Sequence, residues 1–129
     1  GEGMKKVYVL TGPTMNGVIV FGNDYLLIFD KDNKLTQKKR LHKTLIPFKT
    51  ADSEGATTMH THLPETGDYF TPTDICTLLL YGRNAKWDKH MIVSQITVAV
   101  WDCMAGIPAA ASEEDMKAGK NQKKEKKRN

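Results

Sequence analysis

Short runs of β-branched and aromatic residues, each ended by turn-forming residues, are the feature that most constrains this chain. Runs of this length and composition predict strands rather than helices. They occupy residues 7–10, 18–21, 25–29, 44–48, 57–62, 90–94 and 95–102. Gly22-Asn23-Asp24 separates the second run from the third and predicts a hairpin turn, because Gly and Asn tolerate positive φ. Pro47 places the run 44–48 at a sheet edge, since proline donates no backbone hydrogen bond. We therefore expect a chain that is mostly β-sheet.

The intervening segments are polar or helical. Residues 30–34 predict a second turn that leads into the polar segment 35–43, and residues 64–70 predict a loop. One helix is clearly marked: Thr71 is suited to the N-cap, Pro72 to the first helical position and Asp74 to the third, with Gly82 just past the end. Ser112 followed by Asp115 is typical of a second helix start, which predicts a helix near 112–118. The expected fold class is α+β.

The length of 129 residues and an apolar content of 40% predict one domain with one core, which we place at residues 1–116. Residues 117–129 carry seven lysine or arginine residues against one glutamate, a charge of +6, whereas the whole chain carries +4. The rest of the chain is therefore at −2. A lysine-rich segment without apolar residues after Ala118 predicts a disordered basic tail.

Several functional classes are disfavoured. The tail has no aromatic residue on which bases could stack, so we expect it to be a solubilising end rather than a contact with nucleic acid or an anionic membrane. The chain contains no run of 18 apolar residues, so no transmembrane segment is predicted. Its two cysteines are too few for a disulfide framework. No signal peptide is visible, which leaves a cytoplasmic protein and an exported one with its signal removed as alternatives. The oligomeric state is open.

The segment Met59-His60-Thr61-His62 carries the clearest chemical signal. In a strand, His60 and His62 project from the same face, where two imidazoles can bind one ion. Asp74, from the first turn of the next helix, would add a carboxylate. Two histidines and a carboxylate leave the fourth position of a zinc ion to water, the composition of a catalytic zinc site. Each residue also has a simpler interpretation, because an acidic third residue caps a helix without any metal.

The spacing His60-Thr61-His62, eight residues, then Thr71-Pro72-Thr73-Asp74 resembles the motif of the JAMM/MPN (Mov34, RadC-like) metalloproteases. That motif is His-x-His, about seven residues, then Ser-x-x-Asp. The strand at His90-Met91-Ile92-Val93 is similar to one that follows the helix in the RadC branch. The resemblance covers roughly residues 44 to 102 and marks a divergent member, with Thr71 in the place of serine. It implies the mostly β, cytidine-deaminase-like fold of that superfamily.

The resemblance also implies an activity: zinc held by His60, His62 and Asp74, and hydrolysis of peptide or isopeptide bonds by a metal-activated water. Thr71 would help stabilise the oxyanion of the intermediate. The family's general base is a glutamate on an early strand, and none of the early strands expected here contains glutamate. Glu65, in the loop after the histidines, is the candidate base. A lone histidine such as His42 is expected to be a surface or structural residue.

Three functional hypotheses follow. The first is a zinc-dependent hydrolase of peptide or protein substrates with a variant base. The second is a JAMM-like binding or scaffold module that has lost the base. The third is a small β-rich domain whose histidines are surface residues without a metal. No specific nucleic-acid partner is expected under any of them.

Overall fold

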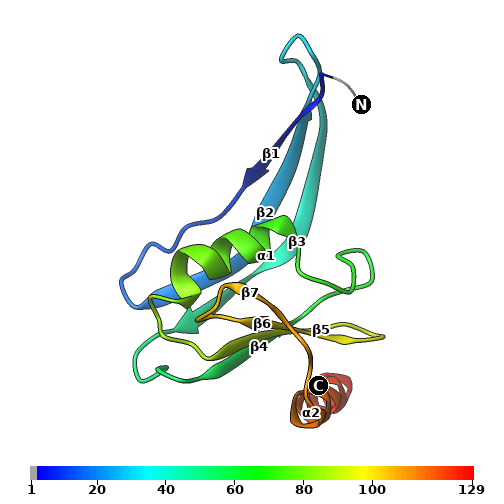
Figure 1. The fold of residues 1–129 in the computed structure, drawn as a ribbon. Coiled ribbons are helices and arrows are strands. Elements are labelled where there is room, and N and C mark those ends of the chain that lie inside the picture. The colour runs from blue at the N-terminus through cyan, green and yellow to red at the C-terminus, as the bar shows by residue number, and fades with distance from the viewer. Residues whose placement is uncertain (1–2) are drawn as a thin grey trace.

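The computed structural model describes residues 3–129 and has seven strands in two sheets, with two helices (Figure 1). The first sheet is antiparallel, in the order β1-β2-β3. Its strands are β1 (Lys5–Val9), β2 (Val18–Phe29) and β3 (Leu35–Lys49). The second sheet has the order β4-β5-β6-β7, with β4 parallel to β5 and the other pairs antiparallel. Its strands are β4 (Thr57–Thr61), β5 (Lys89–Val93), β6 (Val98–Asp102) and β7 (Ile107–Ala109). The expected α+β class, mostly sheet, is confirmed.

The strand β2 corrects one prediction. Residues 18–29 form one strand with a bulge at Gly22–Asp24, not two strands joined by a hairpin. Gly22 and Asn23 do adopt positive φ, of 85° and 48°. A Cβ on Gly22 would lie 2.0 Å from the carbonyl oxygen of Thr44 on β3, so a close backbone approach requires glycine here. The bulge turns Asp24 into the protein, where it is 3% exposed.

The strand β3 extends over the whole of residues 35–49, including the segment 35–43 that was expected only to be polar. Most of its first half is exposed, which explains the missing apolar signal. The turn at residues 30–34 precedes β3, as expected. β3 is an edge strand, as the proline at position 47 predicts.

The helix α1 (Pro72–Thr77) begins as predicted, with Thr71 as N-cap, and continues into a π-helical turn, η1 (Leu78–Gly82). It joins β4 to the parallel strand β5, so β4, α1 and β5 form a β-α-β unit. The main core lies between the sheets and this helix: Ile19 and Phe21 of β2 cluster with Leu78, Trp87 and Trp101. This packing brings one end of β4 and the first turn of α1 close to the bulge in β2.

The helix α2 (Glu113–Arg128) corrects the prediction of a disordered tail at residues 117–129. Its start has a capping box in which Ser112 and Asp115 bond each other's backbone N–H groups, as expected. Ala118 lies against the small apolar cluster of Met91, Val98 and Val100 on β5 and β6. Ala118 has a small side chain and Gly119 has none, so the helix can lie close to the sheet (Figure 1). Composition alone did not predict the helix at residues 117–129, because this packing against the sheet stabilises it.

Candidate metal centre

The strand β4 positions the two histidines as its alternation predicts. His60 is in β4, and His62 follows the strand but continues its pairing, since its N–H donates to the carbonyl oxygen of Val93 at 3.1 Å. The two side chains lie on one face, with their Nε2 atoms 3.0 Å apart. Both side chains are almost fully buried.

Asp74 acts as the cap and faces the histidines at the same time. Its Oδ2 accepts hydrogen bonds from the backbone N–H of Thr71 at 2.8 Å and from the Thr71 hydroxyl at 2.6 Å. Its Oδ1 is buried and has no hydrogen-bond partner within residues 3–129. This oxygen lies 3.5 Å from His60 Nε2. Burial raises the pKa of Asp74, but the neighbouring His60 and His62 outweigh it and hold the pKa well below its usual range.

His42 comes from the other sheet and completes a cluster of four. Its Nε2 lies 3.1 Å from His62 Nε2 and 3.6 Å from Asp74 Oδ1. One ligand atom from each of His42, His60, His62 and Asp74 falls within 4.8 Å of all the others. All four residues are buried. The expectation of a surface position for His42 is therefore wrong, because the packing of the two sheets buries this residue beside the motif.

Asp24 holds the ring of His42. The Nδ1 of His42 is 2.9 Å from both carboxylate oxygens of Asp24, and its backbone N–H donates to Oδ1 at 2.9 Å. Thr73, in the first turn of α1, donates its hydroxyl to Asp24 as well. Burial lowers the pKa of His42, but the carboxylates of Asp24 and Asp74 outweigh it, so the net shift of the pKa is upward.

The Nδ1 atoms of the other two histidines are also engaged. His62 Nδ1 lies 3.0 Å from the carbonyl oxygen of Gly67, which can only accept, so Nδ1 carries the proton. His60 Nδ1 lies 2.8 Å from Nε2 of His90, whose own Nδ1 contacts the hydroxyl of Thr58 at 2.7 Å. Burial lowers the pKa of His60 and of His90, which favours neutral rings with one N–H each.

In their neutral forms, His42 and His62 carry the proton on Nδ1, so their Nε2 lone pairs are directed toward each other and toward the carboxylate of Asp74, with Nε2 of His60 beside them. Lone pairs and a negative oxygen repel at this distance unless a cation lies among them. Four separations among these Nε2 atoms and Asp74 Oδ1, of 3.0 to 3.6 Å, are close to the edge of a tetrahedron around zinc, about 3.3 Å for metal–nitrogen bonds of about 2.0 Å. His62 Nε2 lies 3.3 Å from the other carboxylate oxygen, Oδ2. The side-chain set fits a metal ion, and these four residues can hold one.

The two residues expected to act in catalysis are placed differently from each other. Thr71 is buried beside the cluster, with its hydroxyl donated to Asp74. Glu65 is exposed and forms an ion pair with Lys43 at 3.0 Å. The structure does not bring Glu65 to the cluster, because the loop after His62 directs this side chain toward β3 and solvent.

Sequence reasoning missed Asp24, His42 and His90. Asp24 was assigned to a turn, and 18 residues separate it from His42. The available signal was His90, the second residue of β5, which is directly followed by the apolar, buried residues Met91, Ile92 and Val93. Such a position requires a polar partner, and its partners are His60 and Thr58.

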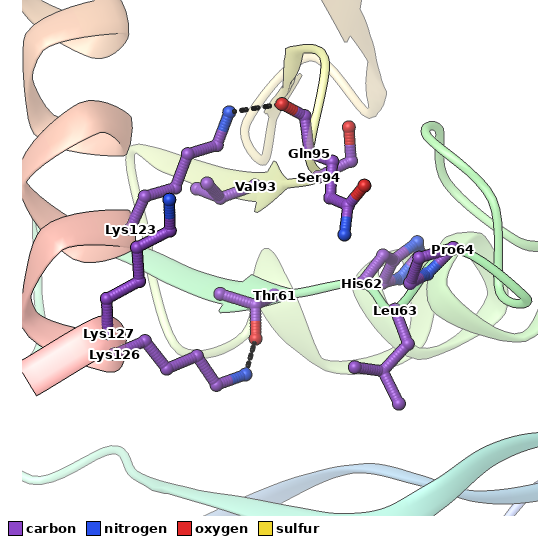
Figure 2. A pocket seen from close by; sticks show the side chains of 10 residues that line it. All are labelled: Thr61, His62, Leu63, Pro64, Val93, Ser94, Gln95, Lys123, Lys126 and Lys127. Atoms are coloured by element: carbon purple, nitrogen blue, oxygen red, sulfur yellow. Dashed lines mark hydrogen bonds between the residues drawn. The ribbon is translucent and has the colours of Figure 1, made fainter. Parts of the chain in front are cut away.

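A groove of about 560 Å³ lies beside the cluster (Figure 2). Its lining consists of Thr61, His62, Leu63 and Pro64 after β4, residues 93–95 between β5 and β6, and Lys123, Lys126 and Lys127 of α2. His62 is the cluster residue that belongs to this lining, although its side chain is buried.

Comparisons with known proteins identify no relative. No protein-family model, no curated protein and no solved structure matches the chain. In residues 3–129, no helix is long and apolar enough to cross a membrane. The function is therefore inferred from the geometry of the site.

Proposed function

We propose that the cluster binds zinc and that the domain is a divergent JAMM/MPN-like hydrolase of peptide or isopeptide bonds. The observation that carries this proposal is the convergence of His60 and His62 on Asp74, whose buried Oδ1 lacks a hydrogen bond. The chain order of strand, loop, helix N-terminus and next strand also supports the proposal. The resemblance implies this same order around the family motif His-x-His and Ser-x-x-Asp, in which Thr71 here takes the place of serine. Nitrogen and carboxylate donors at tetrahedral separations favour zinc.

Each protein group has a defined task in this proposal. Zinc, when bound, supplies a water of lowered pKa and polarises the scissile carbonyl. His60, His62 and Asp74 hold the ion. Gly67 and His90 fix the rings of His62 and His60 through their Nδ1 atoms, as partners of metal-binding histidines commonly do. Thr71 positions Asp74, and its expected role at the oxyanion stays a prediction.

Asp24 and His42 are suited to replace the missing glutamate. Asp24 is on an early strand, upstream of the histidines, where the family has its base. It holds His42 by Nδ1 and leaves Nε2 facing the cluster, where the ring can accept a proton. A carboxylate that orients an imidazole in this way is a recurrent general-base arrangement.

A second function is favoured by one specific observation. His42 Nε2 lies as close to the other donors as they lie to one another, which suits a fourth ligand as well as a base. Four protein ligands, with side chains at most 6% exposed, are typical of a structural zinc site. The domain would then be a JAMM-like binding or scaffold module.

Metal analysis and hydrolysis assays test both functions. The protein is stripped with a chelator, reconstituted with zinc and assayed on peptide and isopeptide substrates. We expect about one equivalent of zinc in the native protein and less than about 0.1 in His60→Ala, which loses all activity. Native protein without zinc would overturn both functions.

The His42→Ala variant separates the two. For a hydrolase with His42 as base, zinc affinity falls by less than about 3-fold while the rate falls by about 100-fold or more. For a four-ligand structural site, zinc affinity falls by about 10-fold or more and the native protein has no hydrolytic activity. Lys43→Ala, an exposed neighbour on the same strand, is the matched control and should change neither quantity.

A further inference from the structure

The groove beside the cluster is formed by two kinds of surface. One wall is formed where the paired strands β4 and β5 end, by Thr61 of β4, by Val93 of β5 and by the residues that follow each of them. Leu63 and Pro64 continue this wall after the strand, and Leu63 is 49% exposed. The opposite wall is the last two turns of α2 (Figure 2). An open groove with apolar and charged walls is a surface that can hold an extended peptide segment.

The wall formed by α2 is positively charged. Lys123, Lys126 and Lys127 lie three and four residues apart, so they share one helix face. No acidic residue lines the groove. Lys127 has no hydrogen bond or ion pair within the described part of the chain, although it extends toward the groove (Figure 2). This face therefore presents cations without counter-charges.

Two of these lysines are fixed in place. Lys123 donates to the backbone oxygen of Gln95 at 3.0 Å, and Lys126 donates to the hydroxyl of Thr61. Both contacts span the groove from helix to sheet, as Figure 2 shows. Basic residues in a last helical turn also favour the helix dipole, but the dipole sets no preference among the faces of the helix. Lysines of α2 also lie outside the groove, so it is the absence of acidic residues from the lining that makes the groove suited to an anionic ligand.

We propose that this groove binds an extended acidic peptide segment, with its side-chain carboxylates at the three lysines. Aromatic side chains are absent from the lining, so bases of a single-stranded nucleic acid have no stacking surface. The apolar stretch at Leu63 and Pro64 suits a peptide that has apolar side chains between its acidic ones. The groove adjoins His62, whose side chain is buried, so the peptide would lie beside the cluster; a role as part of the substrate of the proposed hydrolase, but not the binding, rests on that proposed function.

Binding of defined probes to the full chain tests this inference. The probe is a fluorescent ten-residue peptide of alternating glutamate and alanine, measured by anisotropy with zinc and without it. The same peptide with glutamine in place of glutamate and a single-stranded oligonucleotide of equal charge are the comparison ligands. The groove variant is Lys123→Gln/Lys126→Gln/Lys127→Gln. The matched control is Lys117→Gln/Lys120→Gln/Lys124→Gln, which removes the same charge from the same helix outside the groove.

We expect the groove variant to weaken binding of the acidic peptide by about 10-fold or more and the control by less than about 2-fold. The glutamine peptide should bind at least about 10-fold more weakly than the acidic one. Equal weakening by the two triple variants would overturn the proposal, since it would indicate only the net charge of the helix. Tighter binding of the oligonucleotide, or absence of acidic-peptide binding by the native protein, would overturn it too.

Failure of the proposed hydrolase is distinguishable from failure of the groove. If His60→Ala loses zinc and activity but still binds the acidic peptide with native affinity, the groove is confirmed as a site of its own. If the native protein hydrolyses acidic and neutral substrates with equal kcat/KM and the groove variant is unchanged, the hydrolase stands and the substrate role of the groove is wrong, while the binding measurement decides the groove itself. Circular dichroism of both triple variants at the start verifies that α2 remains helical.

Discussion

Asp24 and His42 form a buried carboxylate–imidazole pair, joined at 2.9 Å across the neighbouring strands β2 and β3. The pair is the contribution of the first sheet to a cluster whose other members belong to the second sheet and to α1. Thr73 on α1 also donates to Asp24, so the first sheet and α1 meet at this carboxylate. A bound cation would therefore tie the two sheets together as well as fill the site.

Asp24→Asn tests whether this pair orients His42. Asparagine keeps the shape but removes the charge that favours an Nδ1 proton on His42. We expect the hydrolytic rate to fall by about 10- to 100-fold and zinc affinity by no more than about 10-fold. NMR of the imidazole nitrogens should show a loss of the Nδ1–H tautomer at His42. Asp32→Asn, an exposed carboxylate in the turn before β3, is the control and should leave all three quantities unchanged.

The unpartnered oxygen of Asp74 predicts that zinc raises the free energy of unfolding. Its Oδ1 is a buried acceptor without a partner, which costs about 1–3 kcal/mol in the metal-free protein and is compensated when an ion binds. Zinc at 100 times its dissociation constant should raise the free energy of unfolding by about 2.7 kcal/mol. In Asp74→Ala, zinc should no longer stabilise the protein, and loss of the cap should cost about 1 kcal/mol more.

The second capping box provides the control for that experiment. Asp115 bonds the N-cap Ser112 as Asp74 bonds Thr71, but it lies at the start of α2, outside the cluster. Asp115→Ala should lose about 1 kcal/mol of stability and keep the full stabilisation by zinc. Equal zinc stabilisation in both variants would mean that Asp74 is only a cap. Thermal or urea unfolding with and without zinc gives the comparison.

The burial of His90 predicts that the free energy of unfolding falls as the pH is lowered. Burial lowers the pKa of His90 well below its usual value, whereas in the unfolded chain the side chain takes up a proton below about pH 6.5. Its contribution is therefore complete above pH 6.5 and declines as the pH falls, by up to about 1.4 kcal/mol per pH unit. His42, with a raised pKa, contributes in the opposite sense.

The variant His90→Gln isolates this contribution, because glutamine can hydrogen-bond to Thr58 and His60 but does not titrate. Urea unfolding of the metal-free protein from pH 7 to pH 5 should show a smaller loss of stability in the variant than in the native protein. The same loss in both would show that His90 does not set the acid sensitivity. A second variant, His42→Gln, should steepen the loss, since it removes the opposing group.

The part of the site that sequence predicts is the part formed by neighbours along the chain. His60 and His62 share a strand face by alternation, and Asp74 is placed by a helix start that Thr71 and Pro72 announce. These relationships are local, so residue spacing is enough to recover them. The hairpin of β5 and β6 was predicted for the same reason.

His42 and Asp24 could not be predicted in this way. Their pairing requires the register of β2 against β3, and that register includes a bulge built from Gly22 and Asn23. Glycine and asparagine at positive φ serve equally in a turn and in a bulge, so the sequence alone does not choose between them. The choice is made by the long partner strand β3, whose exposed first half carries little apolar signal.

The helix α2 provides the last prediction, because its docking depends on one glycine. A Cβ on Gly119 would lie 2.4 Å from Cγ2 of Val98 on β6, and the β-branched valine cannot turn aside freely. Gly119→Ala should gain about 1 kcal/mol in helix propensity but lose about 1–3 kcal/mol to overpacking, so α2 should detach from the sheet rather than become more stable. Hydrogen exchange of the α2 amides should then accelerate, and the acidic peptide should bind more weakly because the three groove lysines leave their places.

Adding Val98→Ala restores room for the new methyl group, so the double variant should recover slow exchange. Asn121→Ala, at an exposed position on the same helix, should slow exchange by itself. If Gly119→Ala leaves exchange and stability unchanged, residues 117–129 do not dock in solution, and the basic segment is the free tail that its composition predicts.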